Sequence, residues 1–361
     1  MGKVSMSPQN LKINLLLLGL SCVISFLGGE AALRALGYYG VRTGKMSGTR
    51  VVDDAMVNYR MIPNNSWILN NIRFRTNAHG WRDTDHAYPK PANTYRIVVL
   101  GDSITFGYGV NLAETYPKQL EQQLNQQPSL PTRYEVISIA MGGLGTEQEA
   151  YLLEREGLKY DPDLVIVGYC SNDPVPGDLI AAQRTSQSRP LLVRSYYRVK
   201  EFAARSSFIH YLYKSAQKIS WQIGVLVGRE EIDAEVRDDV YSRTHADPQR
   251  WGSVMRGFEK FRQLSAQHQL PVMLVIFPLL HHLQDYPWSA LHQQIAAAAS
   301  QNKITVIDLL PRYRQYPQSK LQVDNGDPLH PNAFGHRLAS VTLYEWLTQN
   351  GNNPYSIRRG L

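Results

Sequence analysis

A serine stands where a catalytic nucleophile could work. Residues 96–100 form a short run that is mostly apolar and β-branched, and Gly101-Asp102-Ser103 follows it directly. Such a run predicts a buried strand of a parallel sheet, and open α/β sheets bind ligands just past the carboxyl ends of their strands. Ser103 could there meet a base and a set of backbone donors, the two needs of nucleophilic acyl transfer.

A general base is available near the other end of the chain. Asp327 and His330 lie three positions apart, and Pro331 suits the start of a helix. On a loop that opens a helix, the Asp327 carboxylate can orient the His330 imidazole, whose free nitrogen then accepts the serine proton. The pair alone is equally compatible with an N-capping aspartate beside a surface histidine.

Two further loops could supply donors to a developing oxyanion. Residues 140–145 follow an apolar run and contain Gly142 and Gly143, which permit close approach of the backbone. Residues 168–174 follow another run and contain Asn172, whose side-chain amide can donate a hydrogen bond. Taken singly, each loop also fits a plain turn.

The elements that must position these residues follow a regular alternation. The apolar runs are residues 96–100, 136–139, 164–167, 272–277 and 305–307. Helical patterns lie between them, and their alternation with the runs predicts a three-layer α/β/α sandwich around a parallel sheet of about five strands.

Three helix starts can be read from the sequence. Residues 116–125 have a helical pattern, and Asp247-Pro248 places an N-cap before a proline that opens a helix to about residue 268. Thr146-x-x-Glu149 matches a capping box that would open another helix.

Taken together, the four loops resemble the SGNH hydrolase family, also called GDSL esterases and lipases. The matching blocks occur in the family's order, each after the expected strand, and the resemblance covers about residues 70–348. They are Gly101-Asp102-Ser103, Gly143, Asn172-Asp173 and Asp327-Pro328-Leu329-His330. The resemblance implies an SGNH/flavodoxin-like form of the predicted sandwich and a serine hydrolase that acts on ester bonds.

The resemblance also implies a role for each matching residue. Ser103 would be the nucleophile, His330 the general base and then the acid for the leaving alcohol, and Asp327 the residue that orients His330. The oxyanion hole would comprise the backbone N–H groups of Ser103 and Gly143 and the side chain of Asn172.

Some positions depart from the family's pattern, and others resemble one branch of the family. Cys170-Ser171 precede Asn172 where the family often has Gly-x, and a second glycine precedes Gly143, so the donating glycine stays open. The chain more narrowly resembles the bacterial membrane-anchored branch, through two stretches that this group often shows. They are Asn77-Ala78-His79-Gly80-Trp81-Arg82-Asp83 and the Gly109-Val110 end of the serine block.

The N-terminal segment predicts a membrane anchor. Residues 13–29 carry no charge, and these 17 residues are at the short end of what spans a bilayer. We expect an uncleaved signal anchor with the catalytic domain in the periplasm of a bacterium, tethered by a single pass to the inner membrane. A cleaved signal peptide and a buried core helix are the alternatives.

The whole chain divides into four parts. We expect a cytoplasmic stub and anchor over 1–36, a linker and lead-in over 37–92, a catalytic domain over 93–350 and a tail over 351–361. A helical insertion interrupts the domain at about 174–244. Its apolar residues at steps of three and four predict an amphipathic helix that packs on the core, covers the site or lies against the membrane. They are Ile209, Leu212, Ala216, Ile219 and Ile223.

Composition excludes several classes of protein. With 43% hydrophobic and 19% charged residues, the chain is neither disordered, collagenous nor of low complexity. Two cysteines, Cys22 and Cys170, exclude a disulfide scaffold and a multi-cysteine metal site. The net charge of +7 points to nucleic acid or an anionic membrane, and since no helix resembles a basic recognition element, we expect no nucleic-acid partner.

Other motifs predict no cofactor and no metal. Gly-x-Ser-x-Gly, Gly-x-Gly-x-x-Gly and P-loop sequences do not occur, which disfavours the α/β-hydrolase fold and nucleotide cofactors. The remaining histidines and aspartates form no short metal motif, and we expect Asp308 to be a turn or capping residue and His336 to be structural. The residues weighed for a metal are His281, His282, Asp285 and His292.

The predicted function is therefore a membrane-tethered, extracytoplasmic serine esterase. It would hydrolyse O-acyl esters, such as O-acetyl groups, of an envelope carbohydrate or lipid through an acyl-enzyme. An O-acyltransferase that uses the same Ser-His-Asp site is one alternative, and a non-catalytic envelope-assembly or binding protein on the same fold is another.

Overall fold

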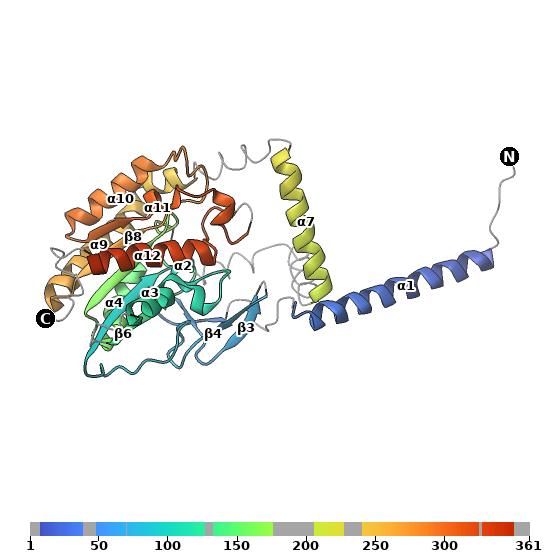
Figure 1. Ribbon diagram of the computed structural model, residues 1–361, viewed down its shortest axis with the longest axis horizontal. Helices are drawn as coiled ribbons and strands as arrows, with labels where there is room; N and C mark the ends of the chain where they lie inside the picture. The colour runs from blue at the N-terminus through green and yellow to red at the C-terminus, as the bar shows by residue number, and fades with distance from the viewer. Residues whose placement is uncertain are drawn as a thin grey trace.

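A parallel five-stranded sheet forms the centre of the computed structural model (Figure 1). The strand order is β6-β5-β7-β8-β9, and each of the five predicted runs falls on one of these strands. The strands are β5 (Thr94–Gly101), β6 (Arg133–Ala140), β7 (Leu164–Tyr169), β8 (Val272–Ile276) and β9 (Thr305–Asp308). The structure describes residues 8–38, 48–69, 71–126, 133–175, 206–226, 240–324 and 327–349.

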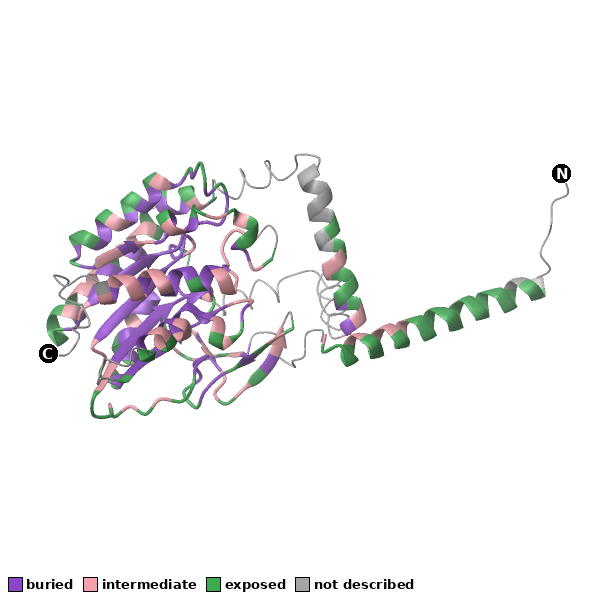
Figure 2. Ribbon diagram, viewed as in Figure 1, coloured by how far each residue is buried: buried purple, intermediate pink, exposed green. Residues whose placement is uncertain are grey.

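Helices flank this sheet. Successive side chains of a strand point to opposite faces, and Val98 and Val99 are both fully buried, so both faces are covered (Figure 2). The three-layer sandwich is thus confirmed: α3 packs on α12, and α4 packs on α9. The helices are α3 (Tyr116–Asn125), α4 (Thr146–Arg155), α9 (Pro248–His268), α10 (Ser289–Gln301) and α12 (Ala333–Gln349).

Short helical segments complete the domain. The α-helical ones are α2 (Ser103–Phe106) and α11 (Leu310–Tyr313), and the 3₁₀ segments are η1 (Leu112–Glu114), η2 (Gly157–Tyr160) and η3 (Gln318–Lys320).

The predicted starts of α9 and α4 are both confirmed, but Thr146 is not the cap of α4. Asp247 accepts hydrogen bonds from the first turn of α9, which opens on Pro248. In α4 the N-cap is Gly145, whose N–H donates to Gln148 Oε1 at 3.3 Å. Thr146 cannot act as the cap because its hydroxyl donates instead to Asp173 Oδ2 at 2.8 Å, inside the core.

Two antiparallel hairpins that the sequence did not predict precede the sheet. They are formed by β1 (Thr49–Val51) with β2 (Tyr59–Met61) and by β3 (Ser66–Leu69) with β4 (Ile72–Arg75). Trp67 and Phe74 are buried and stack at a centroid distance of 5.4 Å, and Phe74 stacks on Phe106 at 5.5 Å. The lead-in is therefore part of the hydrophobic core.

Two further helices lie outside the sheet domain (Figure 1). Helix α1 (Pro8–Ala35) contains the predicted apolar segment, and its residues 12–35 are long and apolar enough to cross a membrane. Helix α7 (Ser207–Leu226) confirms a helix within the predicted insertion. The rest of that insertion, at 176–205 and 227–239, and the tail at 351–361 lie outside the described residues.

Candidate active site

Three of the four predicted loops begin side by side at the carboxyl end of the sheet. Gly101, the last residue of β5, pairs with Ala140 at the end of β6 and with Gly168 in β7. The loops that carry Ser103, the glycine pair and Asn172 leave the sheet from these positions. This edge of an open α/β sheet is where ligands bind.

Helix α2 places Ser103 against the end of its own strand. Asp102 caps the helix, since its Oδ1 accepts the Ile104 N–H at 2.9 Å. A Cβ at Gly101 would lie 1.9 Å from Thr105 Oγ1, so only glycine lets the helix turn back this closely. Ser103 is thus fixed at the first position of α2 and is partly exposed to solvent.

The structure brings Ser103, His330 and Asp327 into one hydrogen-bonded chain. Ser103 Oγ lies 2.9 Å from His330 Nε2, and His330 Nδ1 lies 2.9 Å from Asp327 Oδ2. Asp327 Oδ1 also accepts the backbone N–H groups of Leu329 and His330, at 2.9 and 3.0 Å. Nucleophile, base and orienting carboxylate have these mutual positions in serine hydrolases.

The charge state of Asp327 sets the tautomer of His330. Burial raises the pKa of Asp327, but the hydrogen bonds and charge of His330 and the backbone donors outweigh it, so the pKa is lowered overall. The carboxylate is therefore ionised at neutral pH and holds the proton on His330 Nδ1. His330 Nε2 is then left to accept the Ser103 proton.

The loop around His330 is fixed by contacts from other elements. The Tyr108 ring lies over the imidazole of His330 at a centroid distance of 4.6 Å. The Leu280 N–H donates to Pro328 O at 2.7 Å, and the Val323 N–H donates to His330 O at 2.9 Å. The His330 imidazole and its loop are thus positioned by the segments after α2 and β8.

The glycine loop lies beside the serine. A Cβ at Gly142 would lie 3.9 Å from Ser103 Cβ, and Gly143 has φ 80°, in the left-handed region that favours glycine. The Tyr59 hydroxyl donates to Gly142 O at 3.1 Å, so strand β2 of the lead-in holds this loop.

The Asn172 loop is a tight turn anchored in the core. The Val175 N–H donates to Asn172 O at 2.8 Å, and Asp173 Oδ1 accepts the Cys170 N–H at 3.0 Å. Within the described part of the chain, Asn172 Oδ1 is buried without a hydrogen-bond partner. Cys170 is buried, and burial raises the pKa of its thiol.

A comparison with models of protein families shows which family the chain belongs to. The model of the GDSL-like lipase/acylhydrolase family matches residues 99–338, more than half of the chain. The chain belongs to this family. It is a GDSL-type serine ester hydrolase, as the four sequence blocks predicted, while its place in the membrane-anchored branch stays a prediction.

Solved structures of two esterases and of a lipase/acylhydrolase are similar to this chain. An acetyl xylan esterase, AlAXEase, is 15% identical, covering 70% of this chain and 100% of its own, with a TM-score of 0.41. The esterase EstA from Pseudoalteromonas sp. is 14% identical, with 72% and 99% covered and a TM-score of 0.38. The lipase/acylhydrolase from Enterococcus faecalis is 15% identical, with 70% and 95% covered and a TM-score of 0.37.

No match was found among curated proteins.

A buried arginine of the lead-in fixes the segment after the serine of the GDSL hydrolase. Arg82 donates to Phe106 O and Gly107 O at 2.7 and 2.6 Å and to Val110 O at 2.7 Å. The adjacent Asp83 accepts the Ser138 N–H of β6 at 2.8 Å. Arg82 and Asp83 lie in a stretch that is typical of one branch of the family, but their structural role could not be predicted from the sequence.

Three carboxyl groups of the GDSL hydrolase are buried close to the site. Asp102 precedes Ser103, Asp173 follows Asn172, and Glu149 lies on α4, after the glycine loop. Burial, followed by the charges of Asp173 and Asp102, raises the pKa of Glu149 well above its usual value. The sequence predicted only a capping role for Glu149, so its burial near the site was not foreseen.

The remaining candidates have structural roles. Asp308, at the end of β9, accepts the Leu310 N–H at 2.8 Å, which makes it a turn residue, as predicted, and its Oδ1 lies 2.9 Å from His292 Nδ1. His336 is buried and its Nδ1 accepts the Tyr116 N–H at 3.2 Å, which joins α12 to α3. Across the residues placed by the structure, no group of three or more His, Cys, Asp or Glu side chains could hold a metal.

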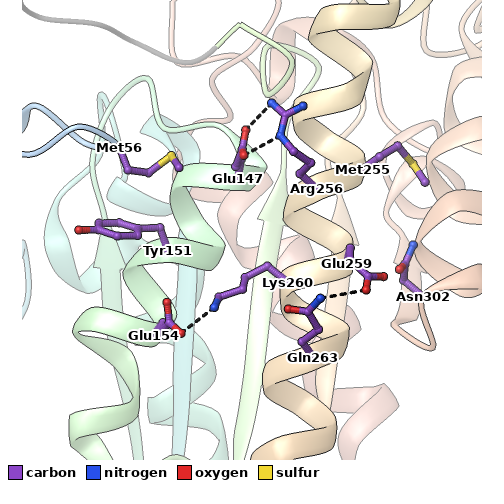
Figure 3. A pocket seen from close by; sticks show the side chains of 10 residues that line it. All are labelled: Met56, Glu147, Tyr151, Glu154, Met255, Arg256, Glu259, Lys260, Gln263 and Asn302. Carbon is purple, nitrogen blue, oxygen red and sulfur yellow. Dashed lines mark hydrogen bonds and ion pairs between the residues drawn. The ribbon is translucent and has the colours of Figure 1, made fainter.

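The groove in Figure 3 lies apart from the candidate active site. Its volume is about 630 Å³, and most of its lining comes from α4 and α9. Ion pairs between Arg256 and Glu147 and between Lys260 and Glu154, at 2.7 and 2.6 Å, bridge the two helices across it. It contains none of the residues of the hydrogen-bonded chain at Ser103.

Proposed function

We propose that the protein is a membrane-tethered, extracytoplasmic serine esterase that hydrolyses O-acyl esters of an envelope carbohydrate or lipid. The observation that carries this proposal is the hydrogen-bonded chain from Ser103 through His330 to Asp327. A chain of this kind activates a serine for attack on an ester carbonyl.

The residues divide the reaction into two steps. Ser103 Oγ attacks the ester carbonyl as His330 Nε2 takes its proton, and the tetrahedral intermediate collapses when His330 gives that proton to the leaving alcohol. Water then attacks the acyl-Ser103 ester, with His330 again as base, and the acid leaves. Asp327 stabilises the imidazolium in both steps.

The oxyanion of each tetrahedral intermediate needs donors near Ser103. We assign this role to the backbone N–H groups of Ser103 and Gly143 and to the side-chain amide of Asn172. The register of β5, β6 and β7 supports the assignment, because it starts all three loops at one edge of the sheet.

The exposure of the site favours hydrolysis over acyl transfer. The side chains of Asp327 and His330 are 19% and 18% exposed, so water can reach an acyl group on Ser103. A transferase would use the same acyl-enzyme but would have to exclude water in favour of a sugar hydroxyl.

Helix α1 supports the membrane tether. Its residues 12–35 present leucine, isoleucine and valine side chains that nothing in the described chain buries, which suits a lipid environment. An N-terminal anchor of this kind delivers the following domain outside the cytoplasm.

The test is hydrolysis of p-nitrophenyl esters of increasing acyl length by the full chain in detergent. Ser103→Ala should lower kcat by roughly a thousand-fold or more, whereas Ser253→Ala, on the surface of α9, should retain the wild-type rate. Wild-type activity in Ser103→Ala would refute the proposed nucleophile.

A further inference from the structure

Helix α7 has an apolar face that is exposed to solvent. Ile209, Leu212 and Ile219 are 38, 50 and 56% exposed, and Ala216 between them is also exposed. These four residues recur at steps of three and four, so they lie on one side of the helix. These four residues form the apolar face of α7.

The opposite side of α7 is turned toward the loop that carries Asp327 and His330. Lys214 Nζ lies 3.1 Å from Asp324 Oδ2, and Asp324 O accepts the Asp327 N–H at 3.0 Å. With about 3.6 residues per turn, all four residues of the apolar face lie within roughly 40° of the direction opposite Lys214. The apolar face therefore points away from the sheet domain.

The start of α7 is joined to the carboxyl-terminal end of α1. The Glu30 carboxylate accepts the Ser206 hydroxyl at 2.8 Å and the N–H groups of Ser207 and Phe208 at 3.1 and 2.9 Å. The rings of Phe26 and Phe208 meet edge to face at 5.8 Å. A carboxylate at a helix N-terminus satisfies free N–H groups and the helix dipole, so Glu30 fixes where α7 begins.

The two helices and the sheet domain have a simple arrangement. Figure 1 shows α7 between the sheet domain and α1, with α1 extending away on the far side. Figure 2 shows exposed residues along α1 and on the part of α7 that is coloured by burial. A bilayer crossed by α1 would thus have its surface at the Glu30 end, at the level of α7. Tyr38 and Tyr211 pack there at 5.6 Å, and tyrosine is a residue typical of membrane interfaces.

We propose that α7 is an interfacial helix whose apolar face lies on the bilayer that α1 crosses. The inference rests on the proposed membrane tether. Amphipathic helices of this kind bury their apolar side at the boundary of headgroups and acyl chains. The net charge of +7 favours a surface that contains anionic lipids.

This placement bears on the substrate. The ion pair between Lys214 and Asp324 holds the loop of Asp327 and His330 against the inner side of α7. The site is then kept close to the lipid surface, and its ester substrate is one that is attached to or lies against the membrane.

The test uses the full chain in vesicles of phosphatidylethanolamine and phosphatidylglycerol. Cys22→Ser removes the exposed cysteine, and Cys170 is buried. Single cysteines are then introduced by Leu212→Cys or Ile219→Cys on α7, Leu16→Cys on α1 and Gln267→Cys on the far helix α9, and each is labelled with the fluorophore NBD. A spin-labelled lipid quenches any label that lies in the bilayer, and hydrolysis of p-nitrophenyl acetate verifies folding.

The expected result is a blue-shifted emission and a loss of fluorescence at positions 16, 212 and 219, with neither change at 267. If 16 is quenched while 212 and 219 behave like 267, the interfacial helix is refuted and the tether stands. If 16 is not quenched, the tether itself fails. A blue shift at 212 and 219 without quenching would show that protein, such as a second copy of the chain, covers the face instead of lipid.

Discussion

Single residues of the site differ in how their surroundings set their charge. Asp327 is partly buried, yet it accepts hydrogen bonds from the His330 ring and from two backbone N–H groups, and its pKa is lowered. Glu149 is fully buried, neither of its carboxylate oxygens has a hydrogen-bond partner in the described chain, and its pKa is raised. The hydrogen bonds and charge of His330 thus lower the pKa of Asp327, whereas burial and the charges of Asp173 and Asp102 raise that of Glu149.

Replacing Asp327 by asparagine should lower kcat by roughly 10³–10⁴, with little change in KM. Asparagine keeps the shape of the side chain but does not stabilise the imidazolium or enforce the productive tautomer of His330. Steady-state kinetics on a p-nitrophenyl ester measure the effect, and Asp285→Asn, at an exposed position of a neighbouring loop, is the matched control. Equal losses in the two variants would contradict the assigned role.

Glu149 should make stability depend on pH in a definite direction. Its pKa is about 4.5 in the unfolded chain and higher in the folded protein, so the folded state holds a proton that the unfolded state has lost. The free energy of unfolding therefore falls as the pH rises from about 4.5 through the folded pKa. Glu149→Gln removes this proton, so the Tm of the variant relative to wild type should increase with pH.

Glu147→Gln is the control for this measurement, since Glu147 lies on the same helix and is paired with Arg256 at the surface. Thermal unfolding between pH 5 and pH 8 would compare the three proteins. Parallel Tm curves for Glu149→Gln and wild type would show that Glu149 does not hold the extra proton.

At the scale of elements, the strands and the site loops could be predicted from local patterns. Apolar runs identified the five strands, and the order of four short blocks identified where Ser103 and His330 meet. The cap of α4 could not be predicted, because the hydrogen bond of Thr146 to Asp173 connects residues that are far apart in the sequence. The hairpins between 48 and 75 were missed because strands of three or four residues carry too little periodicity.

Arg82, which follows the second hairpin in the lead-in, should support the segment after Ser103. Its guanidinium donates to three backbone carbonyls and lies 4.2 Å from the Phe74 ring centroid, a geometry that lysine cannot reproduce. Arg82→Lys should lower the free energy of unfolding by about 1.5–3 kcal/mol and reduce kcat, while Arg250→Lys, exposed on α9, should do neither. Denaturant unfolding and ester hydrolysis would measure the two effects, and a variant as stable and active as wild type would contradict this support.

At the scale of the whole molecule, an apolar helix, α1, lies outside a sheet domain. Figure 2 shows the buried residues concentrated in the sheet domain and the exposed ones along α1. The length and composition of α1 were predictable, whereas its junction with α7 through Glu30 was not, since 176 residues separate Glu30 from Ser206. The proposed tether depends on α1 remaining attached to the folded chain.

Expression of the full chain in a bacterium should therefore yield an uncleaved protein in the inner-membrane fraction that resists extraction with alkaline carbonate. Mass spectrometry of the intact protein would measure whether the N-terminal segment is retained. A product that lacks this segment and fractionates with soluble periplasmic proteins would indicate a cleaved signal peptide instead.

The central claim is that Ser103 carries the acyl group during turnover. The most direct measurement is acid quenching of the enzyme during steady-state hydrolysis of p-nitrophenyl butyrate, followed by mass spectrometry of its peptides. The account predicts a butyryl group on Ser103 in the wild type, and none on any residue of Ser103→Ala. A butyryl group on another residue, with turnover preserved in Ser103→Ala, would contradict it.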